Sequence, residues 1–242
     1  MTTIKEKKIK PVSESSKSEK KRSDIVRAAT EIINAKSYAE ATVIDIAAAL
    51  NLRDAALYYY YPDKRALAYA CHCTSLQRCE QLLKNADEAG ETGEKKLRYF
   101  FHTMLVDSSQ NGPLLYFGDY SYLEEPQRAI ISAWADRLKD ILVKFLSEGM
   151  VDGSIVQCEP ELVVHLLLGM LIWLSKWVPA INGMTVERLM SAIDAVCFRG
   201  LDHSPFVFIE QASKSKSAKK MPPINADAAS ERLAKARKKK AS

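Results

Sequence analysis

Residues 41–67 read ATVIDIAAALNLRDAALYYYYPDKRAL, and this stretch predicts two short helices joined by a tight turn. Thr42 and Asp45 have the spacing of a capping box, in which a hydroxyl and a carboxylate each accept from a free backbone N–H at a helix start. One apolar helical face follows: Val43, Ile46, Ala47 and Leu50. Asn51 then interrupts the pattern, and asparagine tolerates the left-handed backbone that a tight turn between helices requires.

The second short helix is expected over residues 53–60, with Leu57 packed against the first. Ala55 and Ala56 leave the front of this helix thin. Pro62 is expected in the first turn of a longer third helix, because the N–H that proline lacks would have no partner there. A short helix, a tight turn and a thin second helix are typical of a helix-turn-helix, whose second helix enters the major groove of DNA.

Together with residues 23–35, this stretch resembles the DNA-binding head of the tetracycline-repressor (TetR) family of bacterial regulators, and the resemblance covers residues 23–70. The chain departs from the family where Ser37 and Asn51 replace the usual glycines and Arg53 replaces the usual serine of the recognition helix. The base preference of relatives is therefore not transferred. The matching residues lie in one register: Ala28, Ala29, Ile32, Ile33, Tyr38, Thr42, Asp45, Ile46, Ala47, Leu57, Tyr58, Tyr61, Pro62, Lys64 and Leu67.

The side chains around the second helix suit two kinds of DNA contact. Phenol hydroxyls and a lysine bind phosphates, whereas arginine pairs with guanine, aspartate accepts from cytosine and an alanine methyl contacts thymine. The candidates for phosphate contacts are Tyr58, Tyr59, Tyr60 and Lys64, and the resemblance implies the same role for Tyr58, Tyr60, Lys64 and Thr42. The candidates for reading base edges are Arg53, Asp54, Ala55 and Ala56.

The net charge of +5 conceals an uneven distribution. Residues 1–22 carry eight basic and three acidic side chains, and residues 211–242 carry ten and two, so that residues 23–210 are net negative. The head, residues 23–70, is nearly neutral with five basic and six acidic side chains. Much of the long-range attraction to DNA must then come from the tails, and for the N-terminal one we favour phosphate contacts over the alternative of a merely solubilising role. The role of the C-terminal tail stays open.

High aliphatic content, few glycines and little strand-like alternation predict an all-α protein. We expect a disordered basic tail over residues 1–20, a helix-turn-helix domain over 21–70, a helical effector-binding and dimerisation domain over 71–210 and a basic tail over 211–242. The first helix should be capped at Ser23 or Asp24. Later helices are expected near residues 62–83, 94–107, 126–149, 160–178 and 185–200.

The segment over residues 160–178 is apolar on all sides and long enough to cross a bilayer. It contains His165, Ser175 and Lys176 and ends at Pro179, which favours a helix buried on two sides of a protein. Two consecutive helices of this kind suit a four-helix dimer interface. The resemblance likewise implies a homodimer formed through the last two helices.

Aromatic residues are dense between residues 100 and 177, which in most proteins indicates a core. The resemblance implies a small-molecule pocket in this space, and few charges there could orient an ionic ligand. We therefore expect an apolar, aromatic or acyl effector. The candidate lining residues are His102, Tyr116, Tyr120, Trp134 and Trp173.

No enzyme motif occurs, so no catalytic residue and no cofactor is expected. Cys71, His72 and Cys73 cannot close on one ion from adjacent helical positions, and no metal is expected. The five cysteines form no disulfide framework, and the basic N-terminus lacks the apolar core of a secretion signal, which favours the cytoplasm. The sequence thus favours a cytoplasmic, homodimeric repressor that a small molecule releases from its operator. The alternative is a helical protein–protein adaptor with basic docking tails.

Overall fold

The computed structural model describes residues 13–115 and 120–199, and these residues are helical with no strand. The all-α prediction is confirmed. The C-terminal tail and Tyr116 lie outside the described residues, as does most of the N-terminal tail. The elements are α1 (Ser13–Lys36), α2 (Val43–Ala49), α3 (Asp54–Tyr58), α4 (Lys64–Ala89), α5 (Gly93–Asn111), α6 (Glu125–Asp152), α7 (Pro160–Trp177), η1 (Val178–Ala180), α8 (Val186–Ile193) and η2 (Asp194–Phe198).

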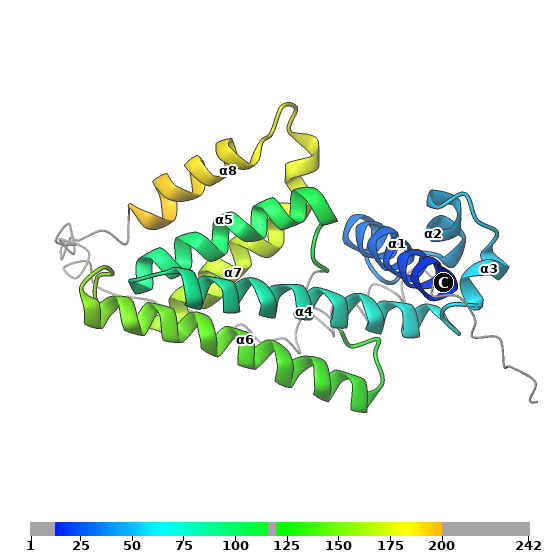
Figure 1. Cartoon of the computed structure of the whole chain (residues 1–242), viewed down its shortest axis with the longest axis horizontal. Helices are drawn as coiled ribbons and strands as arrows, with labels where there is room; N and C mark the ends of the chain where they lie inside the picture. The colour runs from blue at the N-terminus through cyan, green and yellow to red at the C-terminus, as the bar shows by residue number, and fades with distance from the viewer. Residues whose placement is uncertain (1–12, 116–119, 200–242) are drawn as a thin grey trace, which may run out of the picture. The chain divides into compact units, whose positions relative to one another are not determined.

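The helices build two hydrophobic cores. The head core combines α1, α2 and α3 with the first turns of α4, and the body core combines the rest of α4 with α5 to α8. Helix α4 belongs to both, and Figure 1 shows it running from the head helices to lie along α5 and α6. Leu115, from the connection that follows α5, is buried in the head core.

The N-terminal prediction is wrong for residues 13–20, which are helical. Helix α1 begins at Ser13, so that Ser23 and Asp24 lie inside the helix and do not cap it. The buried face of α1 starts only at Ile25. Once that packed part has formed, lysine and glutamate extend it readily, because propagating a helix costs far less than nucleating one.

Helix α4 begins later and ends later than expected. Asp63 caps it, since Oδ1 accepts from the N–H of Ala66 at 2.7 Å, and Pro62 precedes the cap. At the other end the helix continues past Leu83 because Ala86 extends its buried face into the body core. The polar composition of residues 85–93 had predicted a break in the chain instead of this continuation of the helix.

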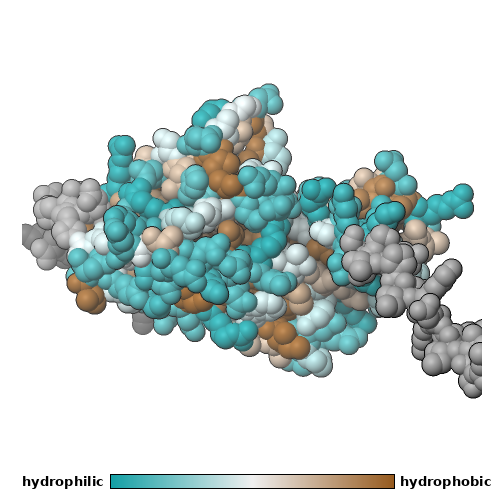
Figure 2. All heavy atoms as spheres, in the orientation of Figure 1, coloured by the Kyte–Doolittle hydropathy of each residue, from teal (hydrophilic) through white to brown (hydrophobic). Residues whose placement is uncertain are grey.

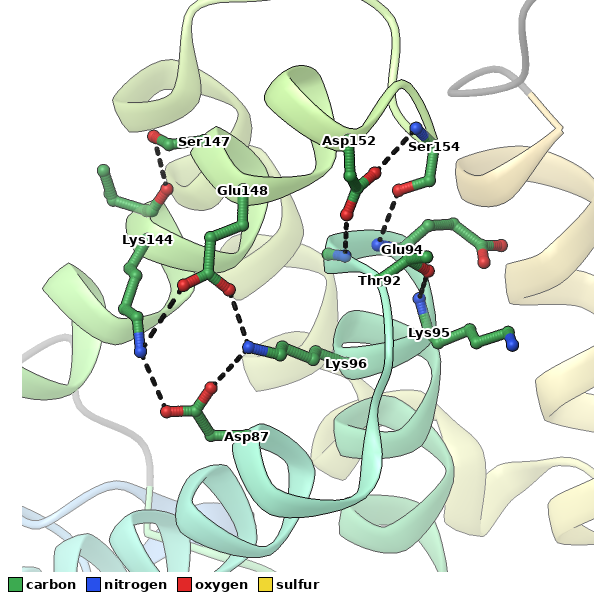
Figure 3. A network of polar contacts seen from close by, with 12 residues as sticks. Asp87, Thr92, Glu94, Lys95, Lys96, Lys144, Ser147, Glu148, Asp152 and Ser154 are labelled. Atoms are coloured by element: carbon green, nitrogen blue, oxygen red, sulfur yellow. Dashed lines mark hydrogen bonds and ion pairs between the residues drawn. The ribbon is translucent and has the colours of Figure 1, made fainter.

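A polar network fastens the ends of α4, α5 and α6 together (Figure 3). The ammonium group of Lys96 lies 2.6 Å from Asp87 Oδ1 and 2.7 Å from Glu148 Oε2, and Lys144 Nζ lies 2.9 Å from Asp87 Oδ2. The hydrogen bonds from Lys96 and then from Lys144 lower the pKa of Asp87. The backbones of α5 and α6 also lie close together here. A Cβ on Gly93 would clash with the carbonyl oxygen of Phe145, so this position requires glycine.

Candidate nucleic-acid interface and ligand cavity

The predicted capping box is present at the start of α2. Asp45 Oδ2 accepts from the N–H of Thr42 at 3.0 Å, and Thr42 Oγ1 accepts from the N–H of Asp45 at 3.0 Å. Lys36 Nζ lies 2.9 Å from Asp45 Oδ1. The hydrogen bonds from Lys36 and then from Thr42 lower the pKa of Asp45 to about 2. The carboxylate therefore ties the end of α1 to the first helix of the helix-turn-helix.

Both positions at which the chain lacks the family's usual glycine have a left-handed backbone. Asn51, in the turn between α2 and α3, has φ 53°, as its residue type predicts. Ser37, just after α1, has φ 81°, a conformation that serine rarely adopts. The turns of the head thus keep the geometry that glycine would favour.

Helix α3 presents its N-terminal end to the outside of the head. Arg53 precedes it with an extended backbone and no side-chain capping bond. Arg53, Asp54 and Ala55 are exposed, and Ala56 is half-buried. Leu57 anchors the other face in the head core. Three of the four residues predicted to read base edges are therefore exposed, as a major-groove contact requires.

The four consecutive tyrosines divide between the surface and the core. Tyr58 and Tyr59 are 51% and 80% exposed, so their hydroxyls are free to approach phosphates. Tyr60 and Tyr61 are half-buried and pack against the head core. Arg22 of α1 covers this pair, with its guanidinium 5.6 Å and 5.5 Å from the two ring centroids.

Arg22 also donates to the backbone carbonyl of Tyr60 at 2.9 Å. It thus braces the chain just after α3, a role that sequence reasoning missed. Composition placed Arg22 at the edge of a basic tail, and no local pattern links it to a residue 38 positions away.

Two predicted phosphate ligands already contact protein groups. Thr42 Oγ1 donates to Asp45 Oδ2 at 2.8 Å. Lys64 Nζ lies 4.2 Å from the ring centroid of Tyr38 and 3.4 Å from the carbonyl oxygen of Ala39, and partial burial lowers its pKa. To bind a phosphate, Thr42 or Lys64 must share its contact with the protein group or give that contact up.

The body contains an apolar cavity of about 310 Å³. Its walls come from α5, α7, η1, the start of α8 and the connection after α5, with Cys79 of α4, and no charged side chain of the described residues lines it. Ser109 and Ser175 donate to carbonyls of their own helices, and Thr185 accepts from the N–H of Arg188. Its principal apolar lining residues are Phe100, Met104, Leu105, Leu114, Leu115, Leu168, Leu171, Ile172, Val178, Met184, Val186 and Leu189.

Two family models match the chain and together cover more than half of it. Residues 25–71 match "Bacterial regulatory proteins, tetR family", and residues 90–201 match "Tetracyclin repressor-like, C-terminal domain". The chain belongs to the tetracycline-repressor (TetR) family of bacterial regulators. The head is thus the DNA-binding domain of a TetR-family regulator, and the body is its C-terminal domain.

Solved structures of TetR-family proteins share this fold. PfmR from Thermus thermophilus is 24% identical with a TM-score of 0.61, and the match covers 74% of this chain and 98% of that one. AibR in complex with isovaleryl coenzyme A and operator DNA is 21% identical with a TM-score of 0.61, covering 73% and 98%. The ketosteroid transcriptional regulator KstR2 of Mycobacterium tuberculosis is 14% identical with a TM-score of 0.65, covering 76% and 96%. No curated protein sequence matches the chain.

None of the four described aromatic and histidine residues expected to line the effector pocket lines this cavity. His102 and Trp173 are exposed, and neither lines the cavity that other residues of α5 and α7 border. Trp134 is half-buried on α6, and Tyr120 packs edge-on against His72 with ring centroids 5.9 Å apart. The cavity is lined mainly by aliphatic and methionine side chains, whereas the prediction rested on aromatic density.

Helix α7 carries an exposed apolar stripe: Leu162, Leu166, Gly169, Trp173 and Trp177. A Cβ on Gly169 would meet no atom of the described residues within 4 Å, so the protomer leaves this part of the stripe open. Further along the chain, Ile181 and Val196 are exposed, and Figure 2 shows apolar residues gathered over α8 beside a mainly hydrophilic surface over α5 and α6. Within the described ranges one helical span, Pro160–Ala180, is long and apolar enough to cross a membrane, with a mean hydropathy of 1.7.

Cys71, His72 and Cys73 point to different surroundings on α4. Cys71 contacts the carbonyl oxygen of Val26 at 3.6 Å, and burial raises the pKa of its thiol to about 12. His72 is fully buried, with Nε2 2.8 Å from the hydroxyl of Tyr122. Cys73 lies on the body side of the helix. These residues serve the packing between head and body in this TetR-family chain.

Proposed function

We propose that this TetR-family chain is a cytoplasmic homodimeric repressor that an apolar small molecule releases from its operator. The observation that carries the proposal is the presence, in one chain, of an exposed recognition helix and an uncharged cavity whose wall reaches the head core.

The DNA contacts divide by side-chain chemistry. Arg53 and Asp54 offer a guanidinium and a carboxylate to base edges at the exposed end of α3. Tyr58 and Tyr59 offer hydroxyls to the phosphates beside them. Exposed Lys20 on the extension of α1 supplies charge that the nearly neutral head lacks.

A second copy of the chain is the partner that the α7 stripe fits. Two copies of α7 and α8 form a four-helix contact, and a two-fold interface repeats the same patch on both subunits. The stripe follows one helical face through Leu162, Leu166 and Trp173. Burial against a second copy also explains why so apolar a helix exposes much of its surface within one protomer.

The cavity favours an effector whose buried part is a hydrocarbon. About 310 Å³ is at the lower end of ligand pockets, and no lining side chain of the described residues is charged, so an ionised group inside would lack a partner. A short or medium acyl chain, or part of a fused-ring skeleton, suits this lining. The AibR structure contains isovaleryl coenzyme A, and KstR2 is a ketosteroid regulator, which supports the same chemistry.

The proposal is tested with the full-length protein. Duplexes selected from a random DNA pool, and footprinting on DNA beside its own gene, should yield a near-palindromic site. Isovaleryl coenzyme A, decanoic acid, a ketosteroid and polar metabolites are then compared for thermal stabilisation and for release of this DNA. We expect stabilisation and release from apolar compounds. Failure to enrich any DNA would favour the adaptor, and release by the polar metabolites alone, none of which has a hydrocarbon part, would refute the apolar effector.

A further inference from the structure

Two walls of the apolar cavity reach the head at one residue, Asn34 of α1. Its side-chain amide donates to the carbonyl oxygen of Leu114 at 2.8 Å, and its own carbonyl oxygen accepts from Lys176 Nζ. Leu114 lines the cavity, and Lys176 follows Ser175, which lines it from α7. Asn34 is only 3% exposed, so water competes little for its amide contact with Leu114, whereas Lys176 belongs to the exposed residues of α7. Movement of either wall therefore acts directly on α1.

Leu115 extends this link into the head. It lines the cavity, yet it is 2% exposed and belongs to the head core with residues of α1 and α4. Its N–H donates to Ser75 Oγ of α4 at 2.9 Å. One residue is thus shared by the ligand cavity and the core of the DNA-binding head.

The segment that contains these residues, which we call the strap (residues 112–115), has open space on a second side. A polar cleft of about 290 Å³ lies among α1, α4 and the end of α5, and Pro113 borders both this cleft and the apolar cavity. Protein interiors are otherwise close-packed, so most cavity walls cannot move without compressing their neighbours. Pro113 therefore has room to shift, while the carbonyl oxygen of Gly112 accepts from Arg78 of α4 at 2.8 Å and holds the start of the strap.

We propose that the strap couples the cavity to the head. An apolar molecule in the cavity pushes Leu114 and Leu115 toward the polar cleft, lengthens the hydrogen bond from Asn34 and withdraws Leu115 from the head core. The support between α1 and α4 then weakens, and the population shifts away from the arrangement that binds DNA. This inference rests on the proposed function, because it places the effector in the apolar cavity.

The test fills the cavity by mutation, so that no ligand has to be known. Ser108 lines the cavity from α5, and Ser108→Phe adds a ring there; Ser175→Phe does so from α7. Affinity for the selected duplex is measured by fluorescence anisotropy, and exchange of the α1 amides by mass spectrometry. We expect either variant to bind DNA about tenfold more weakly and to exchange α1 amides faster.

The strap is then tested in combination. In a Leu115→Ala background, adding Ser108→Phe should change DNA affinity by less than about twofold, because the shared side chain is gone. Leu142→Ala is the matched control, since Leu142 is equally buried but lies on α6 in the body core and does not line the cavity. In that background the tenfold effect should remain. Asn34→Leu should also reduce the effect of Ser108→Phe.

Two results would overturn the proposal. One is unchanged DNA affinity and α1 exchange in both phenylalanine variants, with crystal structures showing the ring in the cavity. The other is an equal effect of Ser108→Phe in the Leu115→Ala and Leu142→Ala backgrounds. Failure of the proposed function looks different, because the wild-type protein would then enrich no duplex, while faster α1 exchange in Ser108→Phe would still support the strap.

Discussion

The ring of Tyr38 in the head lies flat on the ring of Tyr122 in the body, with centroids 3.6 Å apart and planes at 7°. Tyr122 in turn places its hydroxyl 2.8 Å from Nε2 of buried His72. Lys64 covers the other side of the pair, with Nζ 4.2 Å from the Tyr38 centroid. This stack connects the loop before α6 to the helix-turn-helix.

Tyr122→Phe should lower the free energy of unfolding by about 1 kcal/mol, because it removes the hydrogen bond to His72 and keeps the stack. Tyr122→Leu should cost about 1 kcal/mol more, because it also removes the ring contact with Tyr38. Urea unfolding measures both. A double-mutant cycle with Tyr38→Leu checks the assignment, and a coupling energy near zero would show that the rings do not stabilise one another.

Ser37→Gly should stabilise the protein by up to about 1 kcal/mol, because φ is 81° at this position and glycine adopts that conformation without strain. Asn51→Gly is the control and should gain less, since asparagine tolerates the left-handed region. Denaturant midpoints at equal slope measure the difference. A loss of stability in Ser37→Gly would show that the left-handed backbone does not strain the protein at Ser37.

Asp45 should make stability depend on pH in strong acid. Its pKa is lowered from 3.8 to about 2 in the folded protein, so the carboxylate stabilises the fold above pH about 4, and this contribution disappears as the pH falls to about 2. Asp45→Asn should flatten the decline in that window. Thermal midpoints of both proteins across the window measure it, and parallel curves would contradict the ion pair with Lys36.

Gly169→Leu should weaken dimerisation by at least about tenfold, because a side chain there separates two helices that meet at the stripe of α7. The same change should not harm the protomer, since a Cβ at this position meets nothing within 4 Å among the described residues. Ala129→Leu, on the exposed side of α6, is the control. Sedimentation velocity over a dilution series measures both, and an unchanged dimer would place the interface elsewhere.

Arg53→Ala should change the base that is preferred at one operator position, at a cost of about 1–3 kcal/mol for the original base. Tyr58→Phe should instead weaken all sequences alike, because a phosphate carries no sequence information. Binding to a panel of single-base operator variants distinguishes the two. A changed base preference in Tyr58→Phe but not in Arg53→Ala would reverse the roles.

Local chemistry within a few residues determined what the sequence alone could predict. The capping box of Thr42 and Asp45 spans three positions, and the left-handed turn at Asn51 depends on its own side chain. Helical periodicity likewise located the helices of the body, because apolar spacing reports the buried face directly. The ends of helices depend on more than local spacing. Helix α1 begins at Ser13 because helix propagation continues through a polar segment, and α4 ends at Ala89 because packing does the same there.

Only the tertiary structure decided which residues share the cavity and how the cavity meets the head. His102 and Trp173 have suitable chemistry but are exposed and do not line the cavity, and a rotation of about 100° per residue decides which side chains of a helix can reach it. The contact between Asn34 and Leu114 joins residues 80 positions apart and leaves no trace in local spacing. Long-range packing between α1, α4 and the strap creates these relationships, because a side chain meets distant partners only after the helices have docked.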